Sequence, residues 1–154
     1  MSGIDSRLAE LGIVIPDVAP PLAMYVPAVH TGEYVYTSGQ LPFVNGELIK
    51  TGRVGADVNP DEAAECARVC AINTIAAVKH VIGDLDRVIR IVKLVGFVAS
   101  TPDFTGQPLV VNGASNLIGE IFGDAGIHAR SAVGVAALPM NAPVEVELIA
   151  HVRL

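Results

Sequence analysis

Two charged residues in apolar surroundings are the best candidates for chemistry: Arg130, in the stretch Ala129-Arg130-Ser131, and Glu145, in a stretch where valine and glutamate alternate. An arginine side chain is a planar fork of donors that binds a carboxylate through two parallel hydrogen bonds. A glutamate beside a partly buried apolar cleft has a raised pKa and can hold or relay a proton near neutral pH. The two residues therefore predict a site for a small carboxylate with acid-base chemistry. The alternative for each residue is a salt bridge between subunits.

The residues that could act as nucleophiles or metal ligands do not form a known motif. Ser38 lacks the G-x-S-x-G context of a hydrolase serine. The chain has four histidines, which are His30, His80, His128 and His151. Their spacing is not that of metal ligands, and no glycine-rich phosphate loop is present, so we expect no metal and no nucleotide cofactor. Among the histidines, His128 is worth testing because it is close to Arg130, although a loop residue in contact with solvent is the simpler interpretation.

The composition indicates which kinds of partner the chain can have. A net charge of −6, the absence of tryptophan and an aromatic content of 5% argue against nucleic acid as the main partner. Hydrophobic residues make up 51% of the chain, yet no apolar run approaches the ~18 residues that a membrane-spanning helix needs. We therefore expect partner subunits to cover the excess apolar surface. The first residues lack the pattern of a secretory signal, which predicts a cytoplasmic protein.

An α+β fold is predicted to position these groups, as a single domain over residues 1–154 with residues 1–21 as an N-terminal extension that contains a short helix. Strands are expected over residues 24–30, 34–40, 47–50, 87–99, 130–137 and 144–152. Helices are expected over residues 5–11, over 59–83 and within 111–122. Asn45-Gly46 favours a hairpin between strands, because both residues tolerate the positive φ of a type I′ turn.

The helix over residues 59–83 is the clearest of these elements. Asn59 is a good N-cap, Pro60 suits the first helical position, and Gly83 can end the helix. Cys66 and Cys70 lie four residues apart, so they share a helix face with many small apolar side chains. Core packing in a reducing compartment is the favoured interpretation of both cysteines, rather than a redox or metal role.

The strand over residues 87–99 is apolar on both sides. Simple alternation puts Val88, Val92 and Leu94 on one side, and Ile89, Ile91, Val95 and Phe97 on the other. Both faces of the sheet must then be covered. The helices can cover one face, so we expect something outside this chain to cover the opposite one.

The last two strands are expected to pair around the turn at residues 139–143. If Val133 and Val135 face the helices, the opposite face of the sheet carries five other residues: Arg130, Ala132, Gly134, Glu145 and Glu147. At ~3.4 Å per residue, Arg130 and Glu145 would then be about 20 Å apart in one chain. A single site that uses both would need two subunits.

Several segments together resemble the Rid family, the YjgF-like group that includes the RidA enamine/imine deaminases and has the older name endoribonuclease L-PSP. They are Tyr25, the run Thr37-Ser38-Gly39-Gln40-Leu41-Pro42, Ala129-Arg130-Ser131, Leu138-Pro139 and residues 144–150. The resemblance extends over roughly residues 22–154. It implies a chorismate-mutase-like α+β fold, with a mixed sheet, two helices on one face, and a homotrimer whose sheets form a central β-barrel with clefts between subunits.

The resemblance also implies roles for individual residues. The carboxylate-binding arginine of the family falls on Arg130, and the acid that positions a water falls on Glu145. The tyrosine of the cleft falls on Tyr25, and its asparagine falls on Asn116. RidA enzymes usually have a cysteine two residues after the arginine, and here that position is Ala132.

Ser38 and Gly39 match the family strand that contributes a hydroxyl and backbone groups to the cleft. The implied activity is hydrolysis of reactive enamines and 2-imino acids to 2-oxo acids and ammonia, with a small carboxylate as ligand. Two alternatives are a non-catalytic or regulatory metabolite binder and the ribonuclease of the older name. The acidic composition argues against the ribonuclease.

Overall fold

The computed structural model describes residues 3–18 and 23–154. Residues 1, 2 and 19–21 of the expected N-terminal extension lie outside these ranges. The elements, in chain order, are α1 (Gly3–Glu10), β1 (Ala28–Thr31), β2 (Tyr34–Thr37), β3 (Phe43–Val44), β4 (Glu47–Leu48), α2 (Pro60–Ile82), η1 (Leu85–Arg87), β5 (Val88–Ala99), α3 (Gln107–Phe122), η2 (Gly123–Gly126), β6 (Ala129–Val135), η3 (Pro139–Asn141) and β7 (Val144–Val152).

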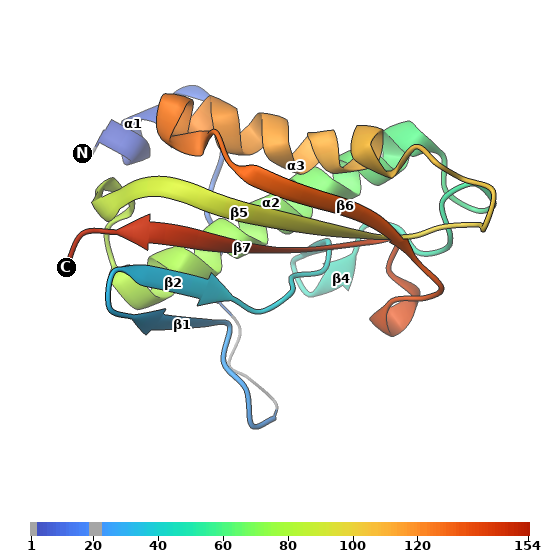
Figure 1. The fold of residues 1–154 in the computed structure, drawn as a ribbon, viewed down its shortest axis with the longest axis horizontal. Coiled ribbons are helices and arrows are strands. Elements are labelled where there is room, and N and C mark those ends of the chain that lie inside the picture. The colour runs from blue at the N-terminus through green and yellow to red at the C-terminus, as the bar shows by residue number, and fades with distance from the viewer. Residues whose placement is uncertain (1–2, 19–22) are drawn as a thin grey trace.

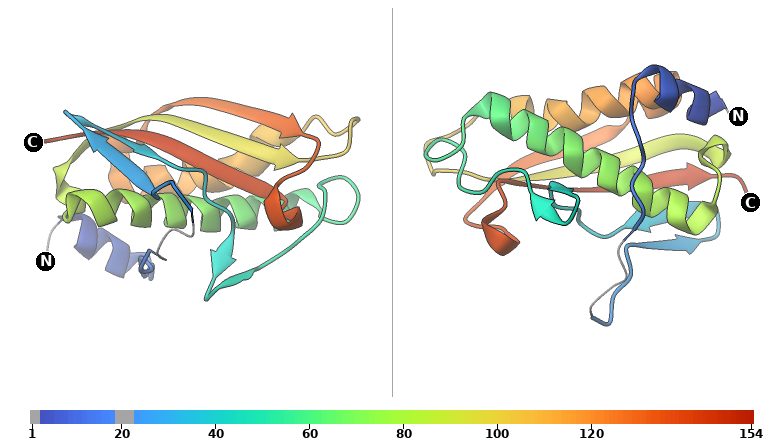
Figure 2. Two further views of the ribbon diagram at one scale, coloured as in Figure 1. Left: turned by 90° about the horizontal axis from the view of Figure 1, so that it is seen from below. Right: turned by 180° about the vertical axis from the view of Figure 1, so that it is seen from behind.

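A mixed five-stranded sheet with the order β1-β2-β7-β5-β6 forms the centre of the fold, and α2 and α3 cover one of its faces (Figure 1). Figure 2 shows both helices on the same side of the sheet and the other side without any helix. The predicted α+β class and the placement of two helices on one face are therefore confirmed. No helix within the described ranges is long and apolar enough to cross a membrane.

Helix α2 has the caps that were predicted. The side chain of Asn59 accepts a hydrogen bond from the backbone N–H of Glu62 at 2.8 Å, and the Glu62 carboxylate accepts one from the N–H of Asn59 at 3.0 Å. Gly83 ends the helix with a φ of 80°. Cys66 and Cys70 are fully buried, and burial raises the pKa of the Cys66 thiol to about 11. Both cysteines are core residues, as predicted.

The two long helices approach closely at Gly113 of α3. A Cβ atom built at Gly113 would overlap the backbone carbonyl oxygen of Ala64 in α2. A backbone atom cannot move aside without shifting its helix, so only glycine allows this spacing. Because α3 also covers the sheet, this contact sets where the side chains of α3 lie.

We expect Gly113→Ala to lower the free energy of unfolding by about 1–3 kcal/mol, because the added methyl group forces α2 and α3 apart. The matched control is Gly119→Ala in the same helix, where a Cβ would meet no atom within 4 Å. That substitution should raise the free energy of unfolding by up to about 1 kcal/mol through helix propensity. Urea unfolding of both variants measures the difference. Equal stability of the two would contradict a tight contact at Gly113.

Several predicted boundaries need correction. The first strand begins at Ala28 rather than at residue 24, and the second ends at Thr37 rather than at residue 40. The strand expected over residues 47–50 ends at Leu48, and it pairs with β3, a short strand that was not predicted. The φ angles of Asn45 and Gly46 between them, 51° and 81°, confirm the predicted turn. The third helix begins at Gln107, four residues before the expected range.

Strand β5 does not alternate as expected. Ile91 and Leu94 were assigned to opposite faces, yet both are buried beneath the helices. The register of β5 against β7 shifts between Val88 and Arg90 and again between Ile91 and Lys93. A β-bulge inserts an extra residue into one strand and changes which side chains face the core, so simple alternation fails here.

The predicted pairing of the last two strands is wrong. β5 lies between them, and β6 runs parallel to β5 at the edge of the sheet, whereas β7 pairs with β5 and β2. Arg130 pairs with Leu94, which is buried beneath the helices, so Arg130 lies on the helix-covered face. Val133 lies on the other face and is 44% exposed. Every second residue of β7, from Val144 to Val152, is buried, and this suits a central strand better than one arm of an edge hairpin.

The face of the sheet opposite the helices carries exposed apolar side chains. They include Val29, Tyr34, Tyr36 and Val133, with Val95 and Ile149 partly exposed. We refer to this surface as the uncovered face. So large an apolar surface is typical of an interface. The expectation that something outside the chain covers it remains a prediction.

Candidate functional site

Arg130 extends from edge strand β6 toward α3. Its Nη1 donates hydrogen bonds to Asn112 Oδ1 at 2.7 Å and to Ser115 Oγ at 3.2 Å. Asn112 and Ser115 are three residues apart in α3, so their side chains lie on one face of the helix, turned toward β6. The guanidinium is thus held between the edge strand and the helix that covers the sheet.

The two hydrogens of Nη1 are both used by these bonds. Nε and Nη2 of Arg130 make no hydrogen bond to any residue within 3–18 or 23–154, and neither nitrogen is enclosed. These two nitrogens form one edge of the guanidinium, the geometry that a carboxylate binds through two parallel hydrogen bonds. The free edge of Arg130 can therefore donate two parallel hydrogen bonds to a small carboxylate.

Ala132 lies two residues beyond Arg130 on the same face and packs against the core. Asn116 is elsewhere: it is exposed and lines a groove of about 240 Å³ between α2 and α3, together with Asp61 and Arg68. The asparagine that contacts the arginine is Asn112, one helical turn earlier. The spacing of Asn112 and Ser115, which matches one helix face, is the signal that could have identified them. We refer to Arg130, Asn112, Ser115 and Ala132 as the arginine half-site.

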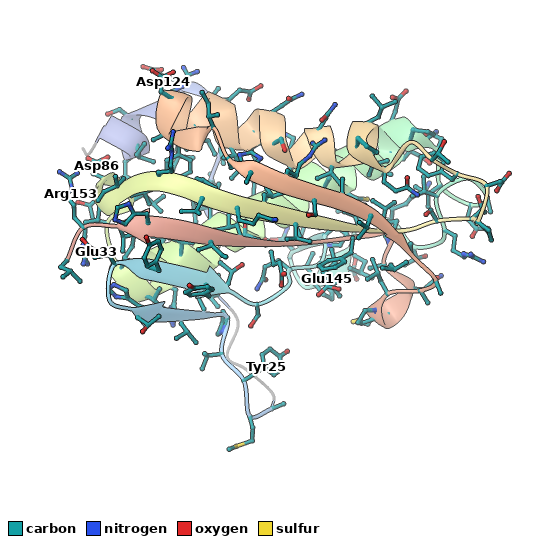
Figure 3. The ribbon with its side chains drawn as sticks, viewed as in Figure 1. Tyr25, Glu33, Asp86, Asp124, Glu145 and Arg153 are labelled. Carbon is teal, nitrogen blue, oxygen red and sulfur yellow. The ribbon has the colours of Figure 1, made fainter. Side chains whose placement is uncertain are left out.

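Glu145 lies at the start of β7, on the uncovered face (Figure 3). A Cβ atom built at Gly39 would overlap the Oε1 atom of Glu145, so the carboxylate rests directly on the backbone of this glycine. The next residue, Gln40, exchanges two backbone hydrogen bonds with Val146, at 2.8 and 3.0 Å. Ser38 donates from its hydroxyl to the carbonyl oxygen of Val26 at 2.6 Å. The structure thus brings Glu145 and Gly39 together, with Ser38 adjacent, and we refer to these three residues as the glutamate half-site.

Burial raises the pKa of Glu145, and repulsion from Glu147 raises it further. No basic side chain in the described part of the chain forms an ion pair with Glu145. A carboxyl group with a raised pKa keeps its proton at a higher pH than an exposed glutamate does. The raised pKa makes Glu145 a better proton donor than an exposed glutamate would be.

Tyr25 lies on the segment that leads into β1 and is 61% exposed. In Figure 3 this segment extends away from the sheet, and the tyrosine lies apart from Glu145. Within one chain, the structure does not bring Tyr25 to either half-site.

Arg130 and Glu145 lie on opposite faces and on opposite flanks of β5, where they pair with Leu94 and Phe97 respectively. With about 3.3 Å per residue along β5 and about 4.8 Å between strands, their Cα atoms are about 14 Å apart. The expected pairing was wrong, but the two residues still do not form one site within a chain. Within one chain, the residues around Arg130 and those around Glu145 therefore form two separate groups.

Comparison with known proteins agrees with this architecture. The sequence model of the family described as "YjgF/chorismate mutase-like, putative endoribonuclease" matches residues 5–152. Protein TCP17 of Trypanosoma cruzi is 44% identical over 97% of this chain and 94% of its own length. The 2-iminobutanoate/2-iminopropanoate deaminase of Escherichia coli is 37% identical over 82% of this chain and 85% of its own.

Among solved structures, a protein of unknown function from Agrobacterium tumefaciens is 47% identical and superposes with a TM-score of 0.90, over 98% of this chain and 92% of that one. The family model matches nearly the whole chain, and these relatives are similar over most of their own length. Both findings establish family membership. The chain belongs to the Rid family, the YjgF/chorismate mutase-like group.

Proposed function

We propose that the chain forms a homotrimer, in which three uncovered faces build a central β-barrel and the arginine half-site of one copy meets the glutamate half-site of the next. Three features support this assembly. The uncovered face carries exposed apolar side chains. Strand β6 is at the edge of the sheet, where its backbone can approach another copy. The two half-sites are too far apart to act together in one chain.

The mass in solution tests the assembly. We expect light scattering at micromolar concentration to give three times the chain mass of 16.0 kDa. The reason is that burial of the uncovered face stabilises the assembly at about 25 cal/mol for each Å² of apolar surface removed from water. A monodisperse monomer would remove the basis for a shared site.

In this assembly the protein hydrolyses small reactive enamines, through their 2-imino acid tautomers, to 2-oxo acids and ammonia. The observation that carries the proposal is the free Nε and Nη2 edge of Arg130, which matches the carboxylate of such a substrate. Relatives named 2-iminobutanoate/2-iminopropanoate deaminase support the same reaction class. The carboxylate fixes the substrate, so that its imine carbon faces Glu145 of the neighbouring copy.

Glu145 supplies the acid-base chemistry of both steps. Its protonated carboxyl gives a proton to the imine nitrogen, water attacks the carbon, and the resulting carboxylate takes a proton from that water. The product is a carbinolamine, with one new C–O bond. Glu145 then protonates the amino group, the C–N bond breaks and ammonia leaves, and the hydroxyl returns its proton to Glu145 as the C=O bond forms. The enzyme ends in its starting state, and water and imino acid have become ammonia and 2-oxo acid.

A coupled assay tests this function. An amino-acid oxidase generates 2-imino acids from several amino acids, and semicarbazide traps the imine that remains. We expect the protein to accelerate the loss of imine, and the boiled protein to have no effect. If small carboxylates raise the melting temperature but no imine is consumed faster than without protein, the chain is a binder and the catalytic proposal is wrong.

A further inference from the structure

We infer that Ser115 and His128 form a hydrogen-bond relay that orients the guanidinium of Arg130, so that its Nε and Nη2 edge faces the ligand. The inference rests on the proposed function, because it concerns carboxylate binding by Arg130. It makes Ser115 and His128 positioning residues, since neither is required to touch the substrate. The relay runs from Arg130 through Ser115 and His128 to the backbone of Gly126.

The direction of the relay follows from its last member. Nδ1 of His128 lies 2.6 Å from the carbonyl oxygen of Gly126, which can only accept, so Nδ1 carries the hydrogen. In the neutral ring, Nε2 is then an acceptor. The hydroxyl of Ser115 lies 3.0 Å from Nε2 and donates to it.

This donation settles the role of Ser115 toward Arg130. The hydroxyl hydrogen points to His128, so the lone pairs of Oγ are free to accept from Nη1 of Arg130 at 3.2 Å. A serine without this histidine could rotate its hydrogen toward the guanidinium, and the contact would then be repulsive. His128 therefore fixes the polarity of the contact, while Asn112 takes the other hydrogen of Nη1 at 2.7 Å.

The anchor of the relay is built into the fold. Gly126 ends η2, the short helix that follows α3, and a Cβ built at Gly126 would lie 2.6 Å from the carbonyl oxygen of Ile118 in α3. Only glycine allows η2 to pack this closely against the helix. The carbonyl that accepts from His128 is thus held at a fixed place relative to Ser115, which lies on the same helix.

The relay determines which ligands fit. It occupies Nη1 and leaves the Nε and Nη2 edge, so an acceptor must present two coplanar oxygens to that edge. A planar carboxylate does so, and the orientation of its plane follows from the orientation of the guanidinium. Without the relay, Arg130 would keep its charge, but its guanidinium could rotate away from the orientation that binds the carboxylate.

Calorimetric titration of the assembled protein with pyruvate tests the relay. We expect Ser115→Ala and His128→Ala each to weaken binding about three- to tenfold, the usual effect of losing one hydrogen bond to a charged group's network. His128→Gln should stay within about twofold of the unaltered protein, because a glutamine amide can accept from Ser115 and donate to Gly126. His80→Ala, on the exposed side of α2, is the control and should bind normally.

Nitrogen-15 NMR of the histidine rings gives a second readout that a merely structural role would not move. We expect the neutral His128 ring to carry its hydrogen on Nδ1 rather than on Nε2, and Ser115→Ala to shift its Nε2 signal. A ring protonated at Nε2 instead would overturn the relay, whatever the affinities show.

The outcomes separate this inference from the proposed function. If Arg130→Ala binds pyruvate normally, the proposed carboxylate site is wrong. If Arg130→Ala loses binding while Ser115→Ala or His128→Ala keeps it, the site stands and the relay is wrong. Circular dichroism and mass in solution check that each variant remains folded and assembled.

Discussion

Glu145→Gln should lower imine turnover about 10²-fold or more, while affinity for small carboxylates changes little. Glutamine keeps the size and much of the hydrogen bonding of the side chain but cannot exchange a proton. Burial raises the pKa of Glu145, and repulsion from Glu147 raises it further, so its carboxyl keeps a proton at a higher pH than an exposed glutamate does. The substitution removes this exchangeable proton. Steady-state kinetics of the coupled assay, with pyruvate titrations beside them, measure the two effects separately.

Glu147→Gln is the matched control, since Glu147 lies two residues along the same strand and on the same face. Its charge only adds repulsion at Glu145, so turnover should change by no more than a few fold. If Glu145 instead bridges subunits, Glu145→Gln would lower the melting temperature of the assembly and leave turnover almost unchanged. That result would overturn the mechanism even with the fold and family as described.

Arg130→Ala should weaken binding of small carboxylates about ten- to a hundredfold and leave the mass in solution unchanged. A charge-assisted pair with two hydrogen bonds contributes about 1.5–3 kcal/mol in a desolvated cleft. Asn112 and Ser115, which lose a partner, are only partly buried and can turn to water, so stability should hardly fall. Titration with pyruvate measures the affinity.

Arg130→Lys separates charge from geometry. Lysine keeps the positive charge but has no fork, so it should recover only part of the affinity. Binding that is unchanged in Arg130→Ala would assign the residue to structure, and full recovery in Arg130→Lys would refute two-point recognition.

Local signals in the sequence were sufficient for the elements whose stability is local. The caps of α2 at Asn59 and Gly83 and the turn at Asn45-Gly46 depend on residues a few positions apart, and all were predictable. The motifs around Arg130 and Glu145 identified the family. The closeness of Glu145 to Gly39 is consistent with the expectation that both residues belong to one cleft, although the role of both residues remains a proposal.

Long-range pairing was not predictable in the same way. Whether β6 pairs with β5 or β7 depends on which strand fills the centre of the sheet, and this is a property of the whole apolar pattern. The register shifts in β5 leave no clear trace in a strand that has apolar residues on both sides. The contacts of Arg130 were missed because they depend on which face of the sheet the side chain occupies, and that face follows from the pairing of β6 with β5.

The separation of Arg130 and Glu145 within one chain has a genetic consequence in the proposed homotrimer. A chain damaged at Arg130 still brings an intact glutamate, and a chain damaged at Glu145 still brings an intact arginine. When two such inactive proteins are dissociated and assembled together in equal amounts, about one cleft in four joins two undamaged halves. Each defect would then be complemented by the other, so two alleles that are each without function could restore activity in one cell.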